Sequence, residues 1–200
     1  MTDEHDTYQT PLTGRYAGSE MCRLWSERRK VELWRQLWLA LAEAEAELGL
    51  DIPDDALRQM RDHLDDIDFA GAGEYERRFR HDVMAHVYAF GDVAPAARGI
   101  IHLGATSQFV GCNADLIRLR EGLGMVARLL ARGIDALGRF AGSWRDQPCL
   151  AFTHYQPAQP TTVGKRAALW CSDFVMDLRE VEHRLETLAF SSAKGTTGTQ

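Results

Sequence analysis

The sequence predicts an all-α protein. Two long segments, one ending before Pro148 and one following Pro160, place apolar residues three and four positions apart. This spacing is typical of helices that bury one face. No segment alternates between apolar and polar residues strongly enough to predict a sheet.

Both long segments carry an apolar seam with a heptad-like rhythm. The seam of the first consists of Leu116, Leu119, Leu123, Val126, Leu130, Gly133, Leu137, Phe140 and Trp144. The seam of the second consists of Val163, Ala167, Trp170, Phe174, Leu178, Val181, Leu185 and Leu188. At ~1.5 Å per residue, the first segment would form a helix of about 43 Å. Such helices bury their seams against other long helices, so we expect partners from further chain, from other subunits or from both.

Three parts are expected along the chain. An irregular arm covers residues 1–18, where prolines and glycines interrupt regular structure. A helical domain covers residues 19–105, and the start of a long-helix bundle covers residues 106–200.

Shorter helices are predicted within the helical domain. The first spans residues 19–48 with Ser19 as its N-cap. The second begins near Pro53, and the third covers residues 74–90. Residues 96–105 are small and apolar, which indicates a packed connection.

The composition is that of a globular chain, with 200 residues, 45% hydrophobic and 26% charged. A formal net charge of -6 argues against general nucleic-acid binding, which needs a basic face. The four cysteines are far apart and form no C-x-x-C pair, so neither a zinc site nor a disulfide framework is expected, and the cytoplasm is the simplest compartment. No apolar run approaches the roughly 20 residues of a membrane span, and residues 1–10 have no signal-peptide pattern.

A histidine, His154, stands in the polar segment from Thr153 to Pro160, between the two long helices. Segments that connect the elements of a rigid scaffold often hold catalytic groups. An imidazole can give or take a proton near neutral pH. The simpler alternative is a histidine that caps a helix or binds a carbonyl group, and composition alone favours that alternative.

Two hydroxyl side chains, Thr106 and Ser107, come just before the first long helix. Hydroxyls and backbone N–H groups at a helix start can bind carboxylate or phosphate. A plain N-cap is the alternative, and without further information it is the better one. Asn113 lies one to two turns further on, where it could face the same cleft or solvent.

Arg80, His81 and Asp82 follow one another, with His86 four positions after Asp82. Arginine pairs bidentately with carboxylate and phosphate. Consecutive residues of a helix point about 100° apart, so these three cannot all face one ligand from a regular helix. Either a helix begins here, or one of the three does not touch the ligand and instead supports a residue that does. Asp82 and His86 could pair, so His86 is expected to be structural. The arginine run of Arg77, Arg78 and Arg80 is most often a solvated face.

Two weaker signals complete the set. Arg15 and Tyr16, in the arm, could hold an anion between a guanidinium and a phenol. Lys165, one turn into the second long helix, could contact an anion or be an ordinary surface lysine.

These strings, in this order, resemble the fumarase/aspartase superfamily and, within it, the adenylosuccinate lyase family of the animal-like type. The resemblance rests on Arg80-His-Asp-Val-Met-Ala-His86, on Ile101-His-Leu-Gly-Ala-Thr-Ser107 with Asn113, and on Phe152-Thr-His-Tyr-Gln-Pro-Ala-Gln-Pro160 with Thr162, Gly164 and Lys165. Further matches are Pro11-Leu-x-x-Arg15-Tyr16, Trp34-Arg-Gln-Leu-Trp38, Leu41-Ala-Glu-Ala-Glu45 and Lys194-Gly-Thr-Thr-Gly-Thr-Gln200. The resemblance covers nearly the whole chain from Tyr8 onward.

The resemblance implies an N-terminal helical domain followed by the first long helices of a fumarase/aspartase-type helical bundle. It implies a lyase that eliminates fumarate from adenylosuccinate, giving AMP, and from the succinylated aminoimidazole carboxamide ribotide of purine biosynthesis. In this β-elimination a base removes the proton next to a carboxylate, and the C–N bond then breaks. The resemblance further implies a homotetramer with shared active sites, a succinyl-purine nucleotide as ligand, and no metal or organic cofactor.

The resemblance also implies roles for individual residues. His154 matches the general acid that protonates the departing nitrogen, and His81 is placed to assist it or to orient the nucleotide. Thr106 and Ser107 match the groups that hold the succinyl carboxylates. The other implied or possible substrate contacts are Arg15, Tyr16, Arg80, Asp82 and Lys165.

One part of the family pattern is missing from the chain. The family base is a serine on a downstream Gly-Ser-Ser-x-Met-Pro-x-Lys-x-Asn-Pro loop, and Ser191-Ser192 is followed by Ala-Lys-Gly instead. We therefore expect the 200-residue chain to be inactive by itself. The alternatives are another lyase of the superfamily, such as an argininosuccinate lyase or an aspartase, and a non-catalytic helical assembly module.

Overall fold

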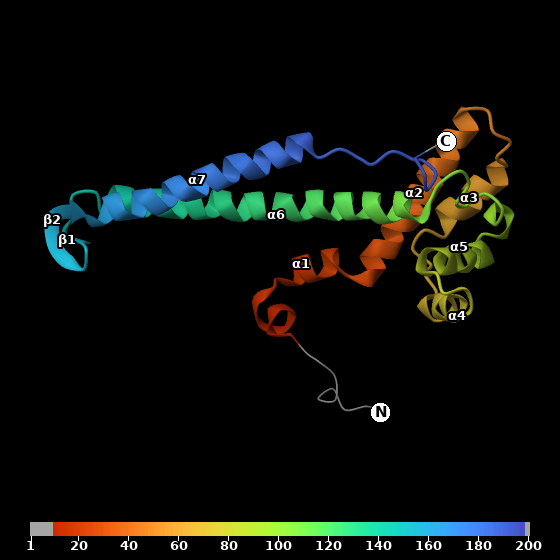
Figure 1. The fold of residues 1–200 in the computed structure, drawn as a ribbon, viewed down its shortest axis with the longest axis horizontal. Coiled ribbons are helices and arrows are strands. Elements are labelled where there is room, and N and C mark those ends of the chain that lie inside the picture. Colours follow the sequence, from red (N-terminus) through yellow and green to blue (C-terminus); the bar gives the residue numbers. More distant parts are fainter. Residues whose placement is uncertain (1–9, 199–200) are drawn as a thin grey trace, which may run out of the picture. The chain divides into compact units, whose positions relative to one another are not determined.

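The structure is a computed structural model that describes residues 10–198. The chain forms two compact units, of which one comprises Met1–Arg118 with Phe190–Gln200 and the other comprises Leu119–Ala189. Helices dominate both units, which confirms the predicted all-α class, although a small two-stranded sheet is also present (Figure 1). Among the described residues, none of the helices combines the length and the apolar character that a bilayer span requires.

The predicted division into arm, helical domain and bundle start stays a prediction. Residues 1–9 of the arm lie outside the described residues. The described part of the arm contains η2 (Leu12–Tyr16), a single π-helical turn. The Lys194–Gln200 string is described as far as residue 198, so its last two residues lie outside as well.

The first predicted helix, over residues 19–48, is wrong as a single element. The structure has α1 (Ser19–Leu24) and α2 (Glu27–Glu47), separated at Trp25 and Ser26. Ser26 interrupts the helix because its hydroxyl accepts a hydrogen bond from the Arg29 N–H and so caps α2. The residue before α1 is Gly18, so Ser19 is the first helical residue and not the cap.

The predicted helix over residues 74–90 is also two helices. After α3 (Asp54–Asp62), which follows Pro53 as predicted, the structure has α4 (Phe69–Phe79) and α5 (Asp82–Val93). Arg80 ends α4 with a left-handed φ of 56°. A residue in this conformation is a common way to end a helix. The packed connection predicted over residues 96–105 holds a short 3₁₀ turn, η3 (Pro95–Ala97).

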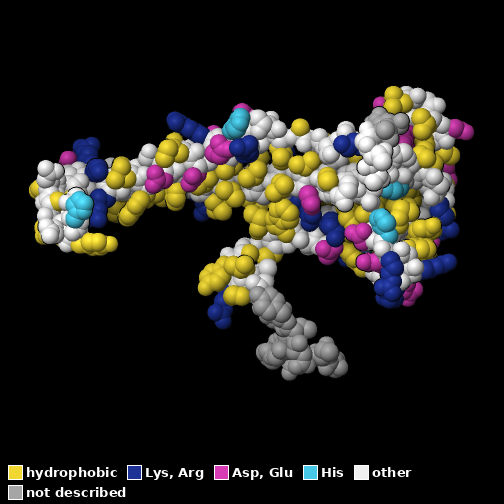
Figure 2. Space-filling model, viewed as in Figure 1, with side chains coloured by type: hydrophobic (Ala, Val, Ile, Leu, Met, Phe, Trp, Pro, Cys, Tyr) yellow, Lys and Arg dark blue, Asp and Glu magenta, His cyan; other side chains and the backbone are white. Residues whose placement is uncertain are grey.

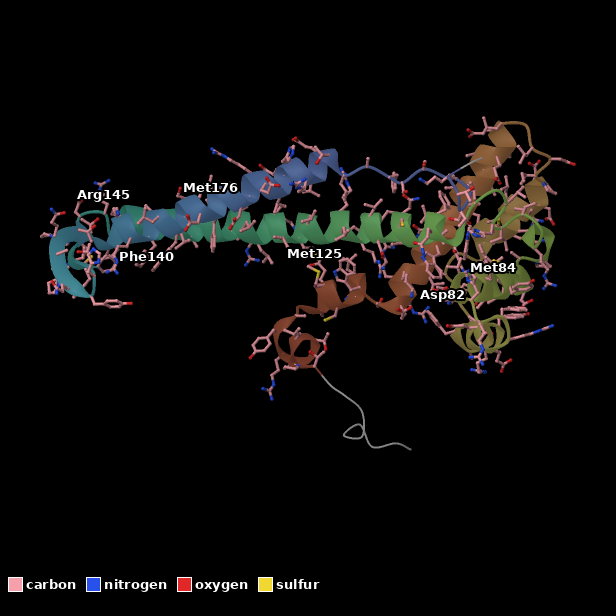
Figure 3. All side chains as sticks on the ribbon, viewed as in Figure 1. Asp82, Met84, Met125, Phe140, Arg145 and Met176 are labelled. Carbon is pink, nitrogen blue, oxygen red and sulfur yellow. The ribbon has the colours of Figure 1, made fainter. Side chains whose placement is uncertain are left out.

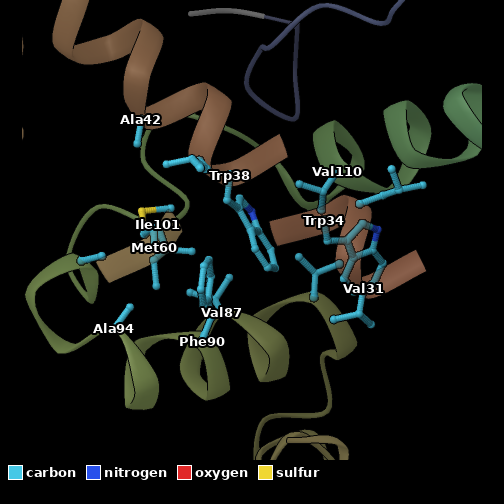
Figure 4. Close-up of a cluster of buried hydrophobic side chains, with 14 of the residues drawn as sticks. Val31, Trp34, Trp38, Ala42, Met60, Val87, Phe90, Ala94, Ile101 and Val110 are labelled. Carbon is cyan, nitrogen blue, oxygen red and sulfur yellow. The ribbon is translucent and has the colours of Figure 1, made fainter. Parts of the chain in front are cut away.

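The core of the first unit lies between α2, α3, α5 and the start of α6 (Ser107–Ser143). Figure 4 shows Trp38 of α2 facing Phe90 of α5, with Ile101 and Met60 beside them and Trp34 further along, near Val31. The Trp38 indole N–H donates to His102 Nδ1 at 3.0 Å, which satisfies a buried polar group. The core thereby fixes residue 102, four positions before Thr106.

Arg35 is a buried cation of this core. It is 1% exposed, its guanidinium lies 4.4 Å from the centre of the Phe90 ring, and it donates to the carbonyl oxygens of His63 and Asp66. Burial lowers its pKa to about 10, with Asp66 and Asp65 opposing that effect. Arg35 therefore ties the α3–α4 connection to the core.

His86 is structural, as expected, but it packs against aromatic rings. It lies edge-on to Trp34 and Phe69, and its Nδ1 is buried without a hydrogen-bond partner. Burial lowers its pKa to about 4, helped by the nearby Arg35 and Lys30 and opposed by Asp82. The imidazole is consequently neutral in the folded chain at neutral pH.

The free energy of unfolding is therefore expected to fall on acidification. An unfolded histidine binds a proton below about pH 6.5, whereas folded His86 accepts it only near pH 4, so stability is lost between these values as pH falls. His102, whose pKa is also lowered by burial, adds to the same slope. Urea titrations between about pH 7 and about pH 4.5 should show a shallower slope for His86→Phe than for the wild type. An identical slope in the two proteins would contradict this account.

The second unit holds the rest of α6, a hairpin and α7 (Val163–Thr187). The hairpin pairs β1 (Pro148–Thr153) with β2 (Gln156–Thr162) in antiparallel register. No sheet was predicted, so this is a correction. The strands escaped prediction because β2 carries Pro157 and Pro160 and is exposed along most of its length, which removes the alternating pattern.

Helix α7 runs alongside α6 within this unit (Figure 1). The ring of Phe174 lies against Gly133, and the Arg120 guanidinium donates to the Leu185 carbonyl at 2.8 Å. Part of the seam stays uncovered, because Trp170 is 62% exposed. Figure 2 shows hydrophobic side chains along the flank of these helices. This exposure agrees with the expectation that further helices cover the seams.

Candidate functional site

His154 lies at the tip of the hairpin. Thr153 pairs with Gln156, so His154 and Tyr155 form a two-residue turn. Their φ angles are 49° and 60°, and both side chains are exposed. A two-residue hairpin turn of type I′ needs a positive φ at both positions, where Asn and Gly are the usual residues.

The turn is unusual because neither of its residues is glycine. A left-handed conformation costs a non-glycine residue roughly 1–2 kcal/mol. Such conformations persist where the surrounding structure imposes them, and they gather at functional sites. The turn thus presents the His154 imidazole to solvent from a fixed backbone, which suits a group that exchanges protons with a ligand.

The hairpin is anchored to the end of α6 and the start of α7. The Val163 N–H donates to the Gln147 carbonyl and the Gly164 N–H to the Trp144 carbonyl, each at 2.9 Å. Figure 3 shows Arg145 in this junction and Phe140 one turn before it. Gly164 is needed here because a Cβ at this position would lie 2.6 Å from the Arg145 backbone nitrogen.

Lys165 lies in the first turn of α7. Its backbone N–H donates to the Thr162 hydroxyl at 3.1 Å, so Thr162 caps the helix. The Lys165 side chain is exposed. The second unit therefore holds both His154 and Lys165. Lys165 is a cationic residue in the first turn of α7, near the hydrogen bonds that join α7 to the end of α6.

Thr106 and Ser107 stand at the start of α6, as predicted. Both are half-buried, and α6 begins at Ser107. They line a pocket of about 260 Å³ in the first unit. Its other residues are Gln108, Phe109, Cys112, Ser191, Ser192, Lys194, Gly195 and Thr196.

The opposite wall of this pocket was not predicted as part of the site. It comes from residues 191–196, which follow α7 in sequence but belong to the first unit. The sequence offered one signal, the run of small residues around Lys194, but no spacing rule connects that run to Thr106 across so many positions. Hydroxyls, backbone N–H groups and one ammonium thus meet around a space that suits an anionic group.

Asn113 is buried behind this pocket wall and binds the backbone of Ser191. Its side chain is 1% exposed, and its amide oxygen accepts from the Ser191 N–H at 2.8 Å. Its amide nitrogen donates to the Ser191 carbonyl at 3.1 Å. Neither of the two alternatives that the sequence left open is observed, because Asn113 is buried and does not itself line the pocket but binds the backbone of Ser191, which does.

Arg80, His81 and Asp82 meet at the junction of α4 and α5. Because α5 begins at Asp82, the three are not consecutive helical residues, which settles the alternative in favour of a helix start. Asp82 and Met84 are labelled at this end of α5 in Figure 3. His81 Nδ1 accepts from the Met84 N–H at 3.3 Å, so a neutral imidazole carries its proton on Nε2 and can donate it outward.

The remaining predicted contacts are on the surface. Arg80 lines a separate surface hollow together with Gly73, Glu76 and Arg77. Arg15 and Tyr16 are exposed in η2, where Tyr16 is 76% exposed. Within the first unit, neither residue lines the pocket of Thr106 and Ser107.

Comparison with known proteins shows what the chain is similar to. The chain is 50% identical to the adenylosuccinate lyase of Schistosoma mansoni over 199 residues, which is 99% of this chain and 42% of that protein. It is 49% identical to the adenylosuccinate lyase of Schizosaccharomyces pombe over 201 residues, with the same shares covered. The chain is a homologue of adenylosuccinate lyase, matching its N-terminal part. No family model matches the chain.

Solved structures place this adenylosuccinate lyase homologue in the fumarate lyase fold. It matches a fumarate lyase from Mesorhizobium sp. BNC1 with a TM-score of 0.79 and 29% identity, covering 90% of this chain and 44% of that one. A 3-carboxy-cis,cis-muconate lactonizing enzyme from Pseudomonas putida matches with a TM-score of 0.84 at 24% identity, covering 94% of this chain and 44% of that one. The second match bears on the fold alone. The chain spans about two fifths of the length of the curated relatives that it matches.

Proposed function

We propose that the full-length protein is an adenylosuccinate lyase, which eliminates fumarate from adenylosuccinate to give AMP. The same site would cleave the succinylated aminoimidazole carboxamide ribotide of purine nucleotide biosynthesis. The observation that carries the proposal is the 50% identity to a curated adenylosuccinate lyase over 99% of the chain. The turn that presents His154 and the pocket of Thr106 and Ser107 supply groups that the reaction needs.

In the proposed reaction, His154 is the general acid. A base removes the proton from the carbon next to one succinyl carboxylate, and the electron pair of that C–H bond forms the new C=C bond. The C–N bond breaks, and its electron pair stays on the nitrogen, which takes a proton from His154. The exposure of His154 on a fixed turn supports this role, because the imidazole can reach a ligand.

The negative charge that develops on the carboxylate needs fixed donors. We propose that Thr106 and Ser107 supply them, because their hydroxyls line a pocket at the N-terminus of a long helix. His81 would donate from Nε2, either to assist His154 or to orient the nucleotide. Further substrate contacts are proposed for Arg80 and Asp82, and also for Arg15, Tyr16 and Lys165.

The proposed enzyme requires more than these 200 residues. The family base loop is not in this sequence, so the base would come from further chain. We also propose that the full-length protein is a homotetramer whose subunits share active sites. Its proposed location is the cytoplasm. The exposed seam residues on α6 and α7, such as Trp170, supply surface that other long helices could bury.

A spectrophotometric assay tests the function. The full-length protein is expected to convert adenylosuccinate to AMP and fumarate, whereas the chain of residues 1–200 alone is expected to show no turnover, because it lacks the base. Argininosuccinate and aspartate, assayed in parallel, separate this proposal from the other lyases of the superfamily. Clear turnover by residues 1–200 would overturn the requirement for further chain, and a full-length protein that cleaves only the amino-acid substrates would overturn the proposed substrate class.

A further inference from the structure

A two-bond fork joins α6 to the segment that follows α7. The Asn113 amide oxygen accepts from the Ser191 N–H, and the amide nitrogen donates to the carbonyl oxygen of the same residue. The second proton of that nitrogen goes to the Phe109 carbonyl at 2.9 Å. The side chain thus uses both of its donors and an acceptor, and two bonds to one residue fix the orientation of Ser191 as well as its position.

The fork lies where it can control the pocket. Ser191 begins the pocket wall that continues through Ser192 and Lys194 to Thr196, while Thr106 and Ser107 form the other wall. Asn113 itself does not line the pocket and is buried. Its contacts therefore reach a ligand only through the loop that it holds.

We propose that Asn113 is a positioning residue, which keeps the Ser191–Thr196 loop closed against Thr106 and Ser107 so that the substrate carboxylate meets a preformed pocket. This inference rests on the proposed function. Asn113 affects substrate binding only through the loop that it holds. Without the fork, the loop exchanges between closed and open arrangements. Only the closed arrangement binds substrate well.

The expected effect is a change in KM with kcat preserved. If only about a tenth of the molecules keep the loop closed, the apparent affinity falls about tenfold, because binding must first select the closed arrangement. At saturating substrate, the bound ligand holds the loop closed. The general acid and the base are not altered, so turnover at saturation is retained.

The test uses steady-state kinetics of the full-length protein with adenylosuccinate. Asn113→Ala is expected to raise KM about tenfold while kcat changes less than about threefold. Ala114→Gly, at the adjacent core position of the same helix, is the matched control for general destabilisation. It should lower the melting temperature and leave KM unchanged.

Hydrogen exchange provides a readout that does not depend on activity. The Ser191 amide should exchange at least about tenfold faster in Asn113→Ala, because its acceptor is gone, and at the wild-type rate in Ala114→Gly. Should Asn113→Ala fail to fold, Asn113→Asp replaces it. The ionised carboxylate of Asn113→Asp keeps the acceptor but loses the donors, and protonation restores one donor, so the ratio of its KM to the wild-type KM should fall as pH is lowered.

The outcomes separate this inference from the function on which it rests. A wild-type protein without turnover of adenylosuccinate refutes the proposed function and, with it, the inference. An active wild type with unchanged KM in the Asn113 variants overturns the inference alone, as does a loss of kcat at constant KM. Unchanged exchange of the Ser191 amide in Asn113→Ala also overturns it.

Discussion

Replacing His154 with asparagine in the full-length protein is expected to lower kcat by about 10²-fold or more while leaving the fold intact. A lost general acid typically costs 10²–10⁴-fold in rate, since the leaving nitrogen must then depart without a proton. Asparagine is the suitable replacement because it tolerates the positive φ that the turn requires at this position. Turnover at saturating adenylosuccinate, together with circular dichroism, measures both parts of the expectation.

The matched control is Tyr155→Asn, at the other residue of the same turn. Tyr155 also has a positive φ, and its side chain is fully exposed. This variant should retain kcat within a few-fold, because it changes the turn without removing the imidazole. Equal losses in the two variants would show that the turn, and not the imidazole, carries the effect, and full activity of His154→Asn would favour a non-catalytic role for the hairpin.

The second large effect is expected at Gly164. An alanine there would place its Cβ 2.6 Å from the backbone nitrogen and Cα of Arg145, and closer still to the Ala141 carbonyl oxygen. These are backbone atoms, so no side chain can move aside, and the ends of α6 and α7 must separate. Overpacking of this kind costs about 1–3 kcal/mol. For a chain of this size, each kcal/mol lowers Tm by roughly 2–4 °C.

Gly138→Ala gives the matched comparison for Gly164→Ala. Gly138 lies inside α6, and a Cβ there would meet nothing within 4 Å. Its replacement is expected to stabilise the helix by about 0.5–1 kcal/mol, because alanine restricts the unfolded chain. Thermal unfolding of the two variants should therefore shift Tm in opposite directions. A common direction would mean that the close approach at Gly164 does not determine stability.

The long helices could be predicted from sequence because their burial is periodic. The seam from Val163 to Leu188 predicted α7 to within about one residue at each end. The break at Arg80 was predicted only as one of two alternatives, a helix start at Arg80–Asp82, because arginine has no special preference for a left-handed φ and the apolar spacing continues across it. The break at Ser26 was not predicted, because a serine inside an apolar stripe does not distinguish an N-cap from an exposed helical position.

The hairpin and the pocket show two other reasons for missed predictions. The turn at His154 and Tyr155 lacks the Asn-Gly type of signal by which two-residue turns are found, although both of its residues adopt a positive φ. The contact between Asn113 and Ser191 depends on where the chain returns after a long excursion, which local patterns do not encode. Sequence reasoning therefore identified the hydroxyls at the helix start, but not the loop that closes over them.

The separation of Asn113 and Ser191 also bears on how the protein is made. The two residues are 78 positions apart. At about 5–20 residues per second, a ribosome needs roughly 4–16 s to add that stretch. During this interval the Asn113 amide has only water and its own helix to bind, so the pocket of Thr106 and Ser107 is among the last parts of its unit to be completed during translation.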